Sequence, residues 1–200
     1  MPRRPNPVLS LAGLVLACFV AGVTFGDEAP GNQSASEATQ SQTTEGYINA
    51  PLAEVWRIFT TADGLRTAGV GQAEVDLRVG GSIRSHDDPR AKLGDPETWV
   101  REILAYDPQR MLASHIRQAP ARFPYRNELG NVWTVTYFTA SGEDMTHVKI
   151  VVLGYRPDAA SQALRQSLAE ANRRTLDTVA KRYWPKCKLC TTEPAADAEK

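Results

Sequence analysis

The stretch from Asp158 to Trp184 constrains the fold most, because it lacks glycine and proline. It is rich in Ala, Leu, Gln and Arg, which favour helices. Asp158 can cap the start of this helix, and Pro185 ends it. At about 1.5 Å per residue the helix would be about 40 Å long, enough to cross a small domain. Its apolar stripe needs a surface to lie on. The stripe contains Leu164, Leu168, Asn172, Leu176, Val179 and Tyr183.

Strands that precede the helix supply this surface. A short strand at 46–50 leads into two short helices, which begin at Pro51 and Leu65. Alternating apolar residues then predict further strands, the first of them with Val75, Leu77 and Val79 on one face. Gly80-Gly81 is typical of a two-residue hairpin turn. The later strands are expected at 82–86, 99–106, 111–117, 132–138 and 145–153.

This order of elements predicts an α+β fold. A curved antiparallel sheet of about six to seven strands can carry the long C-terminal helix across its concave face, with two short helices near its N-terminus. Both the sheet and the helix then bury their apolar faces. The folded domain is expected over residues 46–185.

The charge of the chain excludes one broad class of partner. Lys+Arg and Asp+Glu number 23 each, so the chain as a whole has no general attraction to nucleic acid. The Arg90, Lys92 and Arg101 region is interpreted as a solvated face.

Residues 1–26 predict export. Arg3 and Arg4 precede an almost wholly apolar run, as in a secretory signal peptide. The run is also long enough for an N-terminal membrane anchor, and Cys18 stands in a sequence that looks like a lipoprotein box. Cleavage, anchoring and lipidation all place the domain outside the cytoplasm, in the periplasm or beyond the cell. Residues 27–45, rich in Ser, Thr and Gln, are interpreted as a disordered tether.

Residues 186–200 form a polar tail with one C-x-x-C motif. An oxidising compartment favours a disulfide between Cys187 and Cys190. Free thiols, an intermolecular bond, and a metal or haem-linked role are the alternatives. A thioredoxin-like site is disfavoured, because the motif follows a helix C-terminus whose dipole does not stabilise a thiolate.

Several short motifs carry a family resemblance between residues 47 and 184. Their order and spacing resemble the START-like (SRPBCC) superfamily, which has a helix-grip fold, and within it the branch named after an activator of a heat-shock chaperone ATPase. The motifs include Ile48-Asn49-Ala50-Pro51, Glu54-Val55-Trp56, Asp76-Leu77-Arg78-Val79-Gly80-Gly81, Val100-Arg101-Glu102-Ile103 and Trp133-Thr134-Val135.

The resemblance implies a cavity between the sheet and the long helix that accepts small apolar molecules. Its expected lining is Trp99, Trp133, Val135, Tyr137, Leu168 and Asn172. For the aromatic residues the alternative is ordinary core packing. For Asn172 the alternative to a ligand contact is a hydrogen bond to the sheet backbone, since a buried amide needs a partner.

No pattern of catalytic residues accompanies this cavity. The sequence lacks the G-x-S-x-G motif, and its histidines, His86, His115 and His147, fall on different predicted strands, whereas zinc needs three or four convergent ligands. We therefore expect no catalytic residue, no metal and no cofactor. The leading hypothesis is an exported module that binds a small hydrophobic or amphipathic molecule. The alternatives are a cyclase or hydrolase that uses the same cavity, and an envelope module that binds another protein.

Overall fold

The computed structural model describes residues 40–184 of the protein. The predicted export segment, most of the predicted tether and the motif of Cys187 and Cys190 lie outside these residues. No helix among the described residues is long and apolar enough to cross a membrane.

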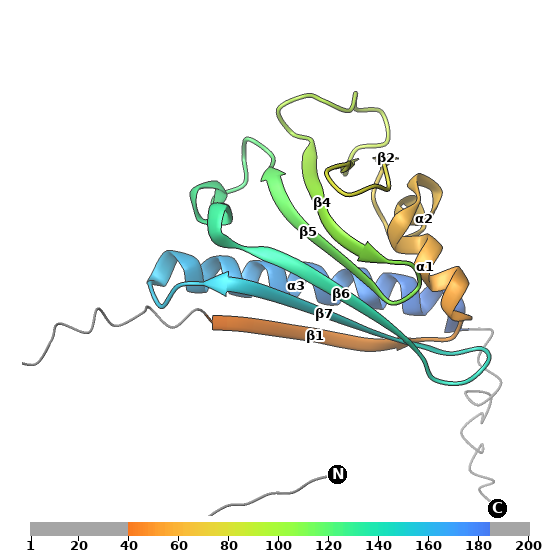
Figure 1. The fold of residues 1–200 in the computed structure, drawn as a ribbon. Coiled ribbons are helices and arrows are strands. Elements are labelled where there is room, and N and C mark those ends of the chain that lie inside the picture. The colour runs from red at the N-terminus through yellow and green to blue at the C-terminus, as the bar shows by residue number, and fades with distance from the viewer. Residues whose placement is uncertain (1–39, 185–200) are drawn as a thin grey trace, which may run out of the picture. The chain divides into compact units, whose positions relative to one another are not determined.

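One antiparallel sheet of seven strands curves around a single long helix (Figure 1). The strand order is β1-β7-β6-β5-β4-β3-β2. The strands are β1 (Gln40–Ile48), β2 (Gln72–Val75), β3 (Ser82–His86), β4 (Trp99–Asp107), β5 (Met111–Gln118), β6 (Trp133–Ala140) and β7 (Thr146–Tyr155). The helices are α1 (Leu52–Thr60), α2 (Ala62–Thr67), the 3₁₀ helix η1 (Arg126–Asn131) and α3 (Ala159–Tyr183). The predicted helix-grip fold is confirmed.

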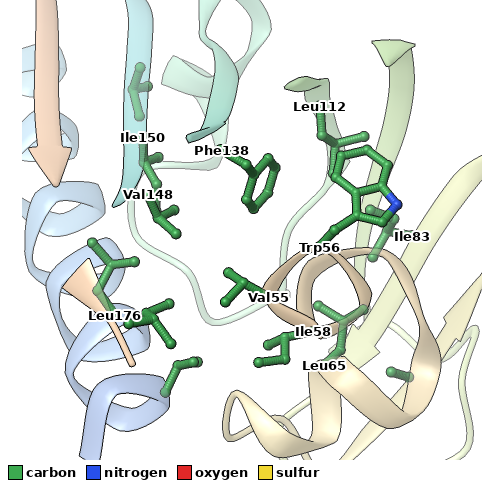
Figure 2. Packing of buried hydrophobic residues seen from close by; sticks show 14 of the residues in the cluster. Val55, Trp56, Ile58, Leu65, Ile83, Leu112, Phe138, Val148, Ile150 and Leu176 are labelled. Atoms are coloured by element: carbon green, nitrogen blue, oxygen red, sulfur yellow. The ribbon is translucent and has the colours of Figure 1, made fainter. Parts of the chain in front are cut away.

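Helix α3 packs on the part of the sheet formed by β1 and β7. Gly46 of β1 faces the helix, and an added Cβ would lie at van der Waals distance, 3.7 Å, from Leu176 Cδ1. Gly46 pairs with Val148 of β7, and Figure 2 shows Val148 beside Leu176, with Ile150 farther along the strand. Leu176 of the helix therefore packs against both β1 and β7.

Helices α1 and α2 close one end of the core. In Figure 2, Val55 and Ile58 of α1 lie between the α3 side and the Leu112 and Ile83 side of the sheet. The Trp56 ring meets the Phe138 ring edge to face, with centroids 5.3 Å apart. Such pairs of aromatic rings stabilise a core beyond the area that they bury.

The start of the sheet differs from the sequence interpretation. Residues 40–45 were expected in a disordered tether, but they belong to β1 and pair along β7. Their polar composition hid the strand, because an edge strand needs few apolar side chains when its backbone pairs with a buried neighbour. Thr44, opposite Ile150, is nevertheless buried.

The connection after β2 also differs. The strand ends at Val75, and Val79 is 63% exposed, so the alternation expected through Val79 stops early. Instead of a two-residue turn, the chain loops through 76–81. Gly81 is required in this loop, because an added Cβ would lie 2.1 Å from the Asp76 carbonyl oxygen.

Packing of α3 on the sheet predicts unequal effects of two leucine truncations. Leu176 is buried against β1, whereas Leu168, two turns earlier, is half-buried. We expect Leu176→Ala to lower the free energy of unfolding by about 2–5 kcal/mol, as for other buried leucines. Leu168→Ala, the matched control, should cost less than half as much. Chemical denaturation measures both, and equal losses would contradict this packing.

The cap of α3 predicts a pH dependence. Asp158 accepts a hydrogen bond from the Ser161 N–H at 2.9 Å and one from Arg156, and both lower the pKa of its carboxyl. A lowered pKa contributes stability above the ordinary value of about 3.9 and loses it as the pH falls through the folded value.

Asp158→Ala should therefore lower the melting temperature at neutral pH, and the difference from wild type should shrink below about pH 4. Asp158→Asn keeps a capping acceptor without the charge, so it should lie between the two at neutral pH. A difference that stays constant with pH would contradict the role of the charge.

Candidate ligand-binding site

The two faces of the sheet are assigned by strand pairing. Side chains that pair across antiparallel strands share a face. Phe138 pairs with Val148, and Thr136 pairs with Ile150. Since Val148 lies on the face that packs on α3, Thr136 and Phe138 share that concave face with it. The alternate residues of β6 point to the convex face.

Three of the expected lining residues lie on that convex face. Trp133 and Tyr137 are 40% and 44% exposed, and Val135 lies between them in the strand. The expectation that these residues face α3 is therefore corrected. In β6 both alternating sets of residues contain apolar and aromatic side chains, so periodicity alone does not show which set faces inward. Pairing with β7 decides it.

Strands β4 and β5 form a part of the concave face beyond β6, on the side away from β1. Arg101 pairs with Ile83 on one side and with Ile116 on the other, and Trp99 lies two residues earlier on the same face. The Trp99 ring meets the Phe123 ring edge to face at 5.0 Å, and Phe123 meets Tyr125 at 5.6 Å. An aromatic row from the connection before η1 thus borders this region.

The rings of this aromatic row pack against the core but remain partly exposed to solvent. Trp99, Ile116, Phe123 and Tyr125 are each only half-buried. We name Trp99, Arg101, Ile116, Phe123 and Tyr125 the aromatic corner. Sequence reasoning found Trp99 and missed the other four residues, because only pairing and the fold of the connection bring them together.

Helix α3 contributes the other two expected residues. Leu168 and Asn172 lie one turn apart on the stripe that continues to Leu176, so they face the same side of the helix. Both are half-buried, and the Asn172 Nδ2 atom is enclosed without a hydrogen-bond partner in the described part of the chain. That a ligand contacts Trp99, Leu168 and Asn172 stays a prediction.

Arg101 is the charged residue of the aromatic corner. The sequence placed it in a solvated face, but its side chain is half-buried and flanked by apolar residues. Burial lowers the pKa of its guanidinium. Within residues 40–184 no carboxylate or other acceptor pairs with it. The sequence signal for this position was an arginine on the same strand face as Trp99 and Ile103.

Two surface pockets of the described residues lie away from the aromatic corner, and a third shares one residue with it. Pockets of about 530 and 270 Å³ follow the boundary between β1 and α3 and share Gln42 and Ala169. A pocket of about 660 Å³ lies between the end of β5 and η1, where His115, Ile116 and Arg126 contribute to its wall. Ile116 connects this third pocket to the residues of the corner.

The histidines occupy three separate places. His86 Nδ1 accepts a hydrogen bond from the Asp88 N–H at 2.9 Å. His115 pairs with Trp133 and therefore belongs to the convex face. His147 Nε2 lies 3.4 Å from Glu45 Oε2. Within the described residues, no group of three or more His, Cys, Asp or Glu is placed to hold a metal ion.

The family model described as Activator of Hsp90 ATPase homolog 1-like protein matches residues 49–181. No curated protein matches the chain in sequence. Several solved structures share its fold at low sequence identity.

Protein MLL2253 from Mesorhizobium loti has a TM-score of 0.57 at 15% identity, covering 75% of this chain and 100% of that one. The Aha1 dimer from Colwellia psychrerythraea has a TM-score of 0.55 at 11% identity, covering 72% and 96%. The di-domain ARO/CYC BexL from the BE-7585A biosynthetic pathway has a TM-score of 0.54 at 14% identity, covering 71% and 45%.

The assignment of faces predicts which tryptophans meet solvent. Trp133 on the convex face should be quenched by iodide, whereas Trp99, half-buried on the concave face, should be quenched less. Trp133→Phe should therefore remove more of the quenchable emission than Trp99→Phe. Steady-state fluorescence measures this. A larger loss in Trp99→Phe would show that the two faces are reversed.

Proposed function

We propose that this chain, which belongs to the family of Activator of Hsp90 ATPase homolog 1-like proteins, is a START-like module that binds a small hydrophobic or amphipathic molecule. The binding site is the concave face between α3 and the strands β4 and β5. No catalysis and no cofactor are part of this proposal.

The observation that carries the proposal is the partial exposure of the apolar side chains in the aromatic corner. These side chains pack against the core and stay half-buried, and α3, which covers β1 and β7, makes few contacts with β4 and β5. Binding sites for small molecules are mostly apolar and aromatic, with a few polar groups that fix the orientation. The corner has this composition, with Arg101 as its polar group and the unpartnered Asn172 amide on the helix side.

Fold similarity adds support of a general kind. One of the similar structures, the di-domain ARO/CYC BexL, belongs to a biosynthetic pathway. A protein with this fold can thus take part in a biosynthetic pathway. The shared fold supports a small organic ligand for the present chain and leaves the identity of that ligand to experiment.

We also propose that the module works outside the cytoplasm. Residues 1–26 either anchor it to the membrane or are cleaved from it as a signal peptide. The basic start and apolar run of that segment support this proposal. Fractionation of cells that express the full chain tests it. Recovery of the protein in the cytoplasmic fraction would contradict it.

Nile red, an uncharged hydrophobic dye, tests ligand binding and its location. We expect its fluorescence to rise on binding to the protein, with the dye lying against Trp99. Trp99→Ala should weaken binding about tenfold, equivalent to about 1.4 kcal/mol. The matched control is Trp133→Ala, which removes the same side chain from the convex face.

Trp133→Ala should leave the affinity for Nile red unchanged. Circular dichroism and melting temperature show whether each variant folds. Equal losses in the two variants, or no binding to the wild-type protein, would contradict the proposed site.

A further inference from the structure

Arg101 occupies an unusual position for a charged side chain. On the concave face it is flanked by Ile83, which is buried, and by Ile116. Along β4 its neighbours on the same face are Trp99 and Ile103. The guanidinium therefore stands on a surface made of apolar side chains.

The acids near Arg101 in sequence are committed to other partners. Glu102, the next residue, points to the convex face and forms an ion pair with Arg117. Glu97 lies 3.5 Å from the Nε of Arg122, and Asp95 faces His86. Among the described residues none of these carboxylates forms an ion pair with Arg101.

Helix α3 offers no acid to this face either. Its two acids, Glu170 and Asp177, are both exposed, while the stripe that faces the sheet carries Leu168 and the neutral Asn172. The Asn172 Nδ2 atom is an N–H donor without a partner in the described part of the chain. The concave face thus presents hydrogen-bond donors from two elements, Arg101 on β4 and Asn172 on α3. Helix α3 adds no carboxylate to that face.

A partly desolvated charge without a counter-charge is unfavourable, and it becomes favourable when an ion of opposite sign binds. The planar fork of a guanidinium fits the oxygens of a carboxylate or a phosphate. Removal from bulk water strengthens such a pair. Trp99, on the same face of β4, and the rings of Phe123 and Tyr125 that follow from it offer at the same time an apolar surface to the rest of a ligand.

We propose that the molecule bound at the concave face is an amphipathic anion. Its carboxylate or phosphate pairs with the Arg101 guanidinium, and its apolar part lies on Trp99, Phe123 and Tyr125. This inference rests on the proposed function and adds the charge of the ligand. Arg101 selects the anion, and the aromatic residues bind any apolar body of suitable shape.

Competition with Nile red by three ligands of equal chain length tests the inference. Decanoate, decyl phosphate and decanol share an apolar chain and differ in the head group. We expect at least one of the two anions to displace the dye from the wild-type protein about tenfold better than decanol, as charge-assisted hydrogen bonds allow. Comparing the two anions shows whether Arg101 favours a carboxylate or a phosphate.

Arg101→Met should abolish this preference, so that neither anion competes better than decanol. Arg101→Lys keeps the charge but loses the fork, so it should retain part of the preference. The matched control is Arg84→Met, which removes an arginine from the convex face, where Arg84 lies 3.6 Å from Glu74. Arg84→Met should behave as wild type. If Arg101→Met does not fold, the wild-type preference and its reduction in Arg101→Lys carry the test.

Two failures are distinguishable. If Nile red does not bind and none of the three ligands binds, the proposed function itself is wrong. If decanol competes as well as both anions, or if the preference survives in Arg101→Met, the function stands and the anion inference is overturned.

Discussion

The packing of α3 on β1 and β7 determines the rest of the structure. Gly46 of β1 faces Leu176 of the helix, and Leu176 lies beside Val148 of β7. Because the helix packs on this side, its backbone does not cover β4 and β5 as closely. There the Trp99 ring of β4 contacts Phe123, which in turn contacts Tyr125 in the connection before η1. The half-buried aromatic corner is a consequence of where the helix lies.

The pleat of the sheet gives its two faces different chemistry. On the convex side, charged side chains pair with one another, as Arg84 does with Glu74 and Arg117 with Glu102. Ion pairs of this exposed kind contribute little to stability. On the concave side, Arg101 stands without such a pair among apolar residues. Glu102, on the convex face, is balanced by Arg117 within the protein. Arg101, the residue before it, faces the concave side, where we propose that it binds an external anion.

Periodicity predicted the elements far better than it predicted the site. The run of 25 residues that forms α3 has one apolar stripe and a capping Asp158, and these signals act within the helix itself. The inward face of β6 was wrong for Trp133, Val135 and Tyr137, because both faces of that strand carry apolar side chains. β1 was missed over 40–45, since an edge strand is defined by its partner and not by its own composition. Arg101 was assigned to solvent for a similar reason, as its environment comes from residues on β3 and β5 that are distant in sequence.

A crystal structure of the protein with decanoate would test the central claim most directly, because it locates the ligand and its head group together. The account predicts the ligand on the concave face, with its carboxylate within hydrogen-bond distance of Arg101 and its chain against Trp99. Ligand density on the convex face beside Trp133 and Tyr137, or in the pockets between β1 and α3, would contradict it.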